Sequence, residues 1–169
     1  KWKVGDMPAR LVQTTTYPES DGSELRIELS SPSEFTVFVR VPRWLKSPAV
    51  ITVNDKPAAV TATPGTFAAI RRRWQHNDTI QITLPFTFRT EAIDEQHSDT
   101  VALMRGPLML VALDSKLEIS AKAIGSPGSL KPAPFAKQAF DLQQVQRPVR
   151  FVPFYTVGEE AYSAYFTAT

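Results

Sequence analysis

The stretch FTVFVRVPRW, residues 35–44, shows most clearly how this chain folds. Apolar side chains occupy every second position from Phe35 to Val41. The positions between them hold Thr36, Phe38 and Arg40. Successive side chains of a β-strand point to opposite faces, so this alternation predicts a strand with one buried and one solvated face. Pro42 ends the run, because proline cannot donate a hydrogen bond to a sheet ladder.

Similar strands, separated by turn residues, recur along the chain. Residues 24–29 (ELRIEL) and 79–84 (TIQITL) alternate in the same way. The turn signals are Asp21-Gly22, Asn54-Asp55, Pro64-Gly65 and His76-Asn77-Asp78. Further strands are predicted at residues 10–17, 49–53, 67–74, 101–104 and 108–113, with a closing hairpin made by 149–157 and 161–167. A spacing of about ten residues per strand and turn is typical of an antiparallel β-sandwich.

Length and a change of composition favour two units. A chain of 169 residues can form one large sandwich or two small ones. Residues 91–99 (EAIDEQHSD) are acidic and polar, which predicts a boundary. We therefore predict an all-β, antiparallel fold of two packed β-sandwich units, residues 1–95 and a smaller unit at 96–169. The second unit is short for independent stability, so we expect one core to continue across the boundary.

Two segments carry weaker signals. Residues 1–8 are predicted to form a loosely structured segment before the first strand, in which Trp2 is either exposed or docked on the fold. Residues 115–144 are interrupted by glycine and proline and predict a loop, with a short helical turn at 137–146 as the alternative.

Composition excludes several classes of function. The chain has no cysteine, so disulfides, thiolate metal sites and cysteine nucleophiles are absent. A net charge of +2, with acids and bases interleaved, is too small for a nucleic-acid-binding face. The basic run 71–73 (RRR) is interpreted as the solvated end of a strand, with an anion or partner contact as the alternative. No stretch approaches the roughly 20 apolar residues of a membrane span, so we expect no membrane partner.

No signal peptide is visible, and the chain begins at Lys1. We expect it to be part of a longer protein, in which a signal or a catalytic domain precedes it.

Three carboxylates, Glu91, Asp94 and Glu95, are the candidates for a glycosidase acid–base pair. They lie in a polar segment without the apolar wall that raises the pKa of a catalytic acid. We therefore interpret them as solvated loop charges.

The chain has two histidines, His76 in a predicted turn and His97 in the acidic segment. Neither has a second histidine or a carboxylate at the spacing of a metal site. Asp94, His97 and Asp99 lie close in sequence, which leaves contact with a surface ion as the alternative to a plain loop. We predict no catalytic residue, no metal ligand and no cofactor in this chain.

Trp44 and Trp74 each follow a strand and an arginine, Arg43 and Arg73. An indole beside a polar group can stack on the apolar face of a sugar ring, or it can close one end of a sandwich core with its N–H bonded to a carbonyl. The sequence favours the core role and leaves both open. Arg105 precedes a tight Gly-Pro corner, where it pairs with an acid or lies at an interface. Arg43, Trp44, Trp74 and Arg105 are therefore the candidates for carbohydrate or interdomain contact.

An ordered series of short motifs carries more information than any one of them. The motifs are TTTYP (14–18), FVRVPRW (38–44), VND (53–55), RRW..ND (72–78), ITLP (82–85), VALMRGPLML (101–110) and PFY (153–155). The series resembles the C-terminal region of glycoside hydrolase family 127, the β-L-arabinofuranosidase-like proteins, over residues 10–113 and 149–157. Asn54-Asp55 stands where the family usually has Asn-Gly, and Leu110 stands where an aromatic residue is common.

The resemblance implies a helical (α/α)6 barrel upstream that carries the chemistry, with two β-sandwiches packed against it. Members of the family use a cysteine nucleophile, a glutamate acid–base and a zinc ion bound by cysteine and glutamate. None of these residues can be assigned to a position in this chain, so no catalytic or metal residue is carried over.

The leading expectation is a non-catalytic accessory region of a hydrolase of arabinose-containing glycans. It would brace the barrel, rim the substrate cleft or form a dimer contact. The alternatives are a carbohydrate-binding module, motivated by Trp44 and Trp74, and a structural or adhesive sandwich. The expected partners are the barrel of the same protein, a glycan or a second copy of the chain. The resemblance implies a periplasmic or extracellular location.

Overall fold

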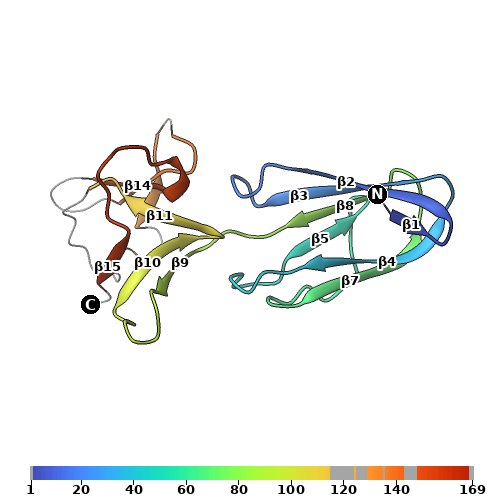
Figure 1. The fold of residues 1–169 in the computed structure, drawn as a ribbon, viewed down its shortest axis with the longest axis horizontal. Helices are drawn as coiled ribbons and strands as arrows, with labels where there is room; N and C mark the ends of the chain where they lie inside the picture. The colour runs from blue at the N-terminus through green and yellow to red at the C-terminus, as the bar shows by residue number, and fades with distance from the viewer. Residues whose placement is uncertain (1, 115–123, 125–128, 135, 143–147, 168–169) are drawn as a thin grey trace. The chain divides into compact units, whose positions relative to one another are not determined.

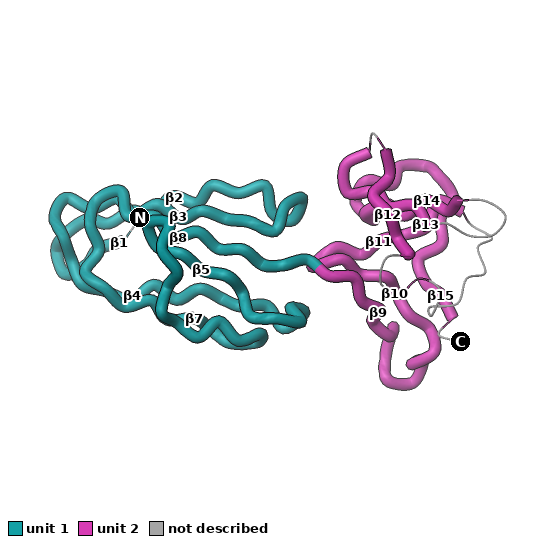
Figure 2. The backbone as a smooth tube through the Cα atoms, turned by 180° about the vertical axis from the view of Figure 1, so that it is seen from behind, with its two compact units in different colours: residues 1–86 teal, residues 87–169 magenta. Residues whose placement is uncertain are grey.

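The computed structural model describes residues 2–114, 124, 129–134, 136–142 and 148–167. Its contacts divide the chain into two compact units, Lys1–Phe86 (unit 1) and Thr87–Thr169 (unit 2) (Figure 2). The all-β, antiparallel fold predicted from the alternation is confirmed. No helix in the described part of the chain has the length and apolar character that a membrane crossing requires.

Unit 1 contains two antiparallel sheets (Figure 1). The six-stranded sheet has the order β1-β2-β3-β8-β5-β6. Its strands are β1 (Trp2–Val4), β2 (Met7–Thr15), β3 (Gly22–Leu29), β5 (Val50–Val53), β6 (Lys56–Pro57) and β8 (Thr79–Thr83). The second sheet pairs β4 (Ser33–Arg40) with β7 (Phe67–Trp74).

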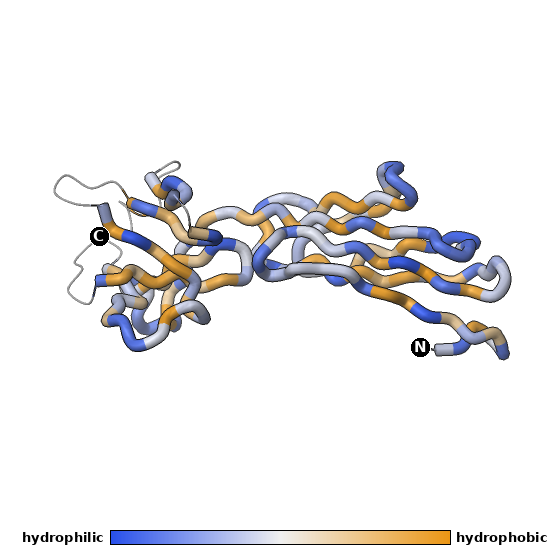
Figure 3. Tube along the Cα trace, turned by 90° about the horizontal axis from the view of Figure 1, so that it is seen from above, coloured by the Kyte–Doolittle hydropathy of each residue, from blue (hydrophilic) through white to orange (hydrophobic). Residues whose placement is uncertain are grey.

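The core of unit 1 lies between these sheets, as the alternation predicts. In β4, Val39 is 6% exposed whereas Phe38 is 64% exposed. Ile27 and Ile80 of the six-stranded sheet belong to the same buried cluster as Val39 and Ile70 of the two-stranded sheet. Apolar and polar residues alternate along these strands (Figure 3). The period of two thus defines the inner face of each sheet.

Two turns of unit 1 are joined through a buried carboxylate. Asn54 and Asp55 have φ values of 50° and 63°, the left-handed pair that a tight hairpin turn requires. The Asn54 Nδ2 group donates to Oδ1 of Asp78 at 2.8 Å, and the Thr79 N–H donates to Oδ1 of Asn54 at 2.9 Å. Asp78 is 7% exposed and also accepts from the Gln75 N–H at 2.8 Å. The β5–β6 and β7–β8 turns therefore hold each other in place.

Unit 2 forms a seven-stranded antiparallel sheet. Six of its strands have the order β12-β13-β14-β11-β10-β15, and the seventh, β9, pairs with β10. Its elements are β9 (Phe88–Ala92), β10 (Thr100–Arg105), β11 (Leu108–Ala112), β12 (Leu130–Pro132), β13 (Phe140–Leu142), β14 (Val149–Pro153), the 3-10 turn η1 (Phe154–Thr156) and β15 (Tyr165–Thr167). Its own apolar cluster contains Leu103, Leu110, Phe140 and Phe151.

The polar segment predicted to be a boundary has a different role. Residues 88–92 pair with residues 101–105, so the polar residues between them form the loop of the β9–β10 hairpin. The division between the units therefore follows Phe86 and precedes the predicted boundary after residue 95. Each described core cluster draws its residues from one unit only.

Two local predictions for unit 2 are corrected. Residues 149–157 and 161–167 do not pair as a hairpin, because β14 pairs with β11 and β13, whereas β15 pairs with β10. Within the predicted loop at 115–144, β12 and β13 pair with each other. The proposed helical turn at 137–146 contains β13, and the rest of that range from residue 143 lies outside the described residues.

Candidate functional site

Trp74 belongs to the core. The side chain is fully buried, and its Nε1–H donates to the Phe35 carbonyl at 3.0 Å. Its ring lies 5.9 Å from the Phe35 ring. A buried indole offers no face to a sugar or to another domain. Trp74 is therefore not a candidate for carbohydrate or interdomain contact. The burial of Trp74 and its hydrogen bond to a backbone carbonyl are those of the core role that the sequence favoured.

Trp44 lies at the edge of an aromatic row. The side chain is half-buried against the unit 1 core and contacts Phe86 with ring centroids 5.7 Å apart. Phe86 in turn contacts Tyr17, whose pKa is raised by burial. Arg43 is exposed, and its side chain packs beside Gly65: a Cβ atom added at Gly65 would lie 3.1 Å from the Cγ of Arg43. Trp44 and Arg43 are therefore held in place and partly accessible.

Arg105 contacts residues of its own unit. Its Nη1 donates to Oε1 of Gln138, and its guanidinium lies 5.1 Å from the centre of the Phe140 ring. Gly106 has a φ of 55°, which is the backbone conformation that the sequence assigned to this corner. Arg105 is half-buried, so these contacts hold it at the β10–β11 corner.

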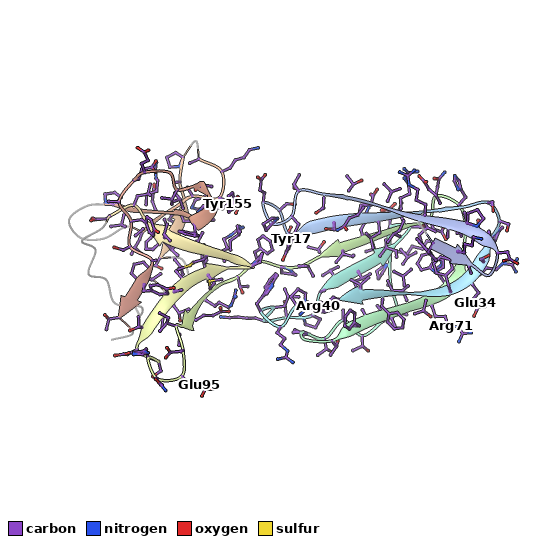
Figure 4. All side chains as sticks on the ribbon, viewed as in Figure 1. Tyr17, Glu34, Arg40, Arg71, Glu95 and Tyr155 are labelled. Carbon is purple, nitrogen blue, oxygen red and sulfur yellow. The ribbon has the colours of Figure 1, made fainter. Side chains whose placement is uncertain are left out.

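The acidic segment is a solvated loop. Asp94 accepts hydrogen bonds from Nδ1 of His97 at 2.8 Å and from the backbone N–H groups of Gln96 and His97. These bonds lower the pKa of the Asp94 carboxyl, with the bond from the His97 side chain contributing most. Glu91 pairs with Arg89, and Glu95 is exposed (Figure 4). No described group of three metal-binding side chains is close enough to hold an ion.

Two hollows lie on unit 1 away from the predicted residues. The larger of the two, about 400 Å³, is lined by threonine and serine residues of β2, β3, β8 and the β2–β3 connection, with Glu24 and Gln81. The smaller, about 320 Å³, contains Trp2, Arg10 and Glu28. The sequence left Trp2 open between exposure and docking, because its neighbours come from distant parts of the chain.

Comparison with known proteins identifies the family. The family model described as "Beta-L-arabinofuranosidase, GH127 middle domain" matches residues 1–86. The chain belongs to glycoside hydrolase family 127. The expected resemblance is thus correct for the family but wrong for the region, since unit 1 corresponds to the middle domain and not to the C-terminal one.

Solved structures of family 127 share the fold over nearly the whole chain. A GH127 beta-L-arabinofuranosidase from Geobacillus stearothermophilus T6 aligns with a TM-score of 0.74 and 20% identity over 98% of this chain. The GH127 beta-arabinofuranosidase BT3674 aligns with a TM-score of 0.70 and 18% identity over 99% of this chain. A comparison with curated proteins gave no match.

The chain spans about a third of those family 127 structures, 31% of the first and 33% of the second. Most of each structure therefore lies outside the aligned part. The chain thus corresponds to one portion of each of those proteins.

Proposed function

We propose that the chain is the non-catalytic β region of a family 127 hydrolase that acts on arabinose-containing glycans. In this proposal it braces the helical barrel that carries the reaction. The supporting observation is the match of residues 1–86 to the middle-domain model, together with the small share of the related structures that the chain spans. No step of the hydrolysis is assigned to its residues.

The outer face of the β4–β7 sheet is the surface we assign to the barrel. Phe38 and Phe67 are 64% and 62% exposed. Arg40 pairs with Phe67 across the strands, and Phe38 pairs with Ala69 beside them, so these side chains share one face. Large exposed aromatic residues on neighbouring positions are typical of interfaces. The opposite end of the face carries the Glu34–Arg71 ion pair (Figure 4).

The test uses the complete protein from which the chain comes. We expect its coding sequence to place several hundred codons of helical pattern before Lys1. Replacing Phe38 and Phe67 by serine should lower the thermal stability and arabinofuranosidase activity of that protein. Val50→Ser is the matched control, because Val50 is 55% exposed but lies on the six-stranded sheet.

Three results would contradict the proposal. Further sandwiches encoded upstream would favour a structural or adhesive role. Arabinosidase turnover by the purified 169-residue chain would show that it is itself catalytic. Concentration-dependent dimerisation abolished by Phe38→Ser would assign this face to a second copy of the chain.

We also propose a periplasmic or extracellular location. The family resemblance supports it, and a cleavable signal peptide in the complete coding sequence is the expected finding. A coding sequence without any export signal would contradict it.

A carbohydrate-binding role is the second candidate function. Trp74 no longer supports it, whereas Trp2, which is 38% exposed and whose ring contacts that of Phe35, does.

A further inference from the structure

The two sheets of unit 1 differ in width, and the difference leaves part of the inner face of the wider sheet open. Among the described residues, only β4 and β7 oppose the six-stranded sheet. Leu11 of β2 pairs with Ile27 of β3, so both side chains point to the inner face. Ile27 is fully buried, whereas Leu11 is 36% exposed. The inner faces of a sandwich normally bury their apolar side chains, so the exposure of Leu11 shows that β2 lacks cover.

The other side of the six-stranded sheet, at β5, is closed by the segment 58–62. Within it, Ala58, Val60 and Ala62 pack on the core of unit 1, whereas residues 59 and 61 are exposed. The Ala49 N–H donates to the Ala62 carbonyl at 3.1 Å, which fixes the end of the segment. Ile51, on the inner face of β5, is only 6% exposed. One segment with alternating side chains is therefore enough to close a side of this sandwich.

The uncovered side is the one at which β4 ends the two-stranded sheet. The Ser33 hydroxyl donates to Sδ of Met7 in β2 at 3.7 Å, and the Phe35 ring contacts the Trp2 ring of β1. β7 pairs with the other edge of β4 and continues through the turn at residues 75–78 into β8. The edge of β4 that does not pair with β7 is therefore on the side of β1 and β2.

β4 presents a row of backbone groups along this side, and we call this row the β4 edge. The Val41 N–H donates to the Thr66 carbonyl at 2.9 Å, on the β7 side. In an antiparallel ladder, alternate residues direct both backbone groups to the same partner, so residues 34, 36, 38 and 40 direct theirs away from β7. No described strand pairs with the β4 edge. Proline and inward-pointing charges, which commonly protect edge strands, are both absent from the sequence of β4.

We propose that the β4 edge takes up a further β-strand, which a part of the complete protein outside these 169 residues supplies. An added strand accounts for both features, because its backbone pairs with the β4 edge and its alternate side chains cover Leu11. The chain spans only 31% and 33% of two family 127 structures, so most of each such protein is available to provide this segment. The assignment of the strand to the complete hydrolase rests on the proposed function. The segment should alternate, with apolar residues facing the core of unit 1.

The test compares the 169-residue chain with the complete protein by amide hydrogen exchange at single-residue resolution. The N–H groups of Thr36 and Phe38 belong to the β4 edge. They should exchange about tenfold or more slowly in the complete protein, because the added strand must open before they can exchange. The N–H groups of Val37 and Val39 are the matched control, since they point to β7 and should be protected in both proteins.

Two variants test the β4 edge and the cover of β2 separately. Thr36→Pro removes one N–H of the β4 edge and keeps the bonds to β7, because proline is tolerated where the N–H of an edge strand faces solvent. Leu11→Ser leaves the backbone unchanged and removes the side chain that the added strand would cover. Each should lower the melting temperature of the complete protein more than that of the 169-residue chain. Val50→Ser, at a β5 position that is 55% exposed, should give small and equal shifts in both proteins.

Two outcomes would overturn the inference. One is equal exchange of the Thr36 and Phe38 N–H groups in the two proteins, together with equal melting shifts for Leu11→Ser. The other is protection of these groups in the 169-residue chain alone that rises with its concentration, which would assign the β4 edge to a second copy of the chain.

The same measurements distinguish this inference from the proposed function. A barrel that contacts only the outer face, through Phe38 and Phe67, would leave the Leu11→Ser shift equal in both proteins. The proposed function would then stand while the inference failed. A protected β4 edge in a complete protein without a helical barrel would support the inference and contradict the proposed function.

Discussion

The two units reach a β fold by different routes. In unit 1, buried residues recur at every second position in β3, β7 and β8, and β2 and β3 pair over seven positions, from Ala9–Leu29 to Thr15–Ser23. In unit 2, several strands are only three residues long, and β10 is paired with β9 along one edge and with both β11 and β15 along the other. Local pattern therefore determines unit 1, whereas unit 2 depends on contacts between distant segments.

The buried carboxylates of the two units also differ in the partners that they bind. Unit 1 buries the Asp78 carboxylate between two turns, where it accepts bonds from Asn54 and Gln75. Unit 2 buries Asp141 to a similar extent, 9% exposed, but its partner is Arg150 across β13 and β14, whose side chain is 44% exposed. Buried hydrogen bonds contribute more to stability than exposed ion pairs, because solvent and salt screen the latter. The buried carboxylate of unit 1 thus joins two turns, whereas that of unit 2 joins two paired strands.

The largest expected effect is a loss of stability in unit 1 alone when the Trp74 side chain is removed. Trp74→Ala deletes a fully buried indole and its bond to Phe35, and should cost unit 1 about 3 to 5 kcal/mol of unfolding free energy. The remaining two of the three tryptophans also lie in unit 1, so their fluorescence reports that unit alone. Methyl NMR signals of Leu103 and Leu110 report unit 2. Phe38→Ala, on the exposed face of the same sheet, is the control.

The same experiment tests the expectation of one continuous core. Unit 2 signals that persist after unit 1 has unfolded would indicate two separate folding units. Simultaneous loss of both would indicate a single cooperative core. Proteolysis near residues 87–99 that releases a stable fragment would agree with the first result.

A smaller loss is expected from Asp78→Ala. The change leaves the Asn54 side-chain amide and the Gln75 N–H without their carboxylate partner. Unpaired, partly buried donors should cost about 1 to 3 kcal/mol, measured by urea unfolding through tryptophan fluorescence. Asp55→Asn, in the adjoining β5–β6 turn, is the control, because asparagine tolerates the left-handed backbone of residue 55. An equal loss in both variants would contradict the special role of Asp78.

Periodicity was sufficient for most of unit 1. It predicted which side of β4 is buried, and Asn54-Asp55 predicted a left-handed turn that the φ values confirm. It could not separate Trp44 from Trp74, because both follow an arginine at a strand end. Their difference is tertiary: Trp74 lies within β7 opposite Ser33, whereas Trp44 lies beyond the end of β4.

The sequence was less informative where short or polar segments take part in long-range pairing. Residues 91–99 were interpreted as a boundary because their polarity is that of a linker, yet a hairpin loop has the same polarity. Three-residue strands such as β13 contain too few alternations to predict a partner. Trp2 was left undecided because Phe35, whose ring it contacts, comes from another strand far from it in the sequence.

The stability of unit 2 should depend on acid through Asp141. Hydrogen bonding from Arg150 lowers the pKa of the Asp141 carboxyl below its value in the unfolded chain. The contribution is therefore complete above the ordinary aspartate pKa of about 4 and is lost as the pH falls through the lower, folded value. Melting of unit 2 should show this acid dependence, and Asp141→Asn should reduce it. An unchanged acid profile in Asp141→Asn would contradict the assignment.

The smallest effect is expected on the exposed face of β4. Phe38→Ser removes a side chain that is 64% exposed, so the unfolding free energy of the isolated chain should change by less than about 0.5 kcal/mol. The same substitution should destabilise the complete hydrolase, because there the face is expected to contact the barrel. Calorimetry of both proteins provides the comparison, with Val50→Ser as the control in each. A loss of stability in the isolated chain would show that Phe38 supports unit 1 itself, and the face would then no longer be free for a partner.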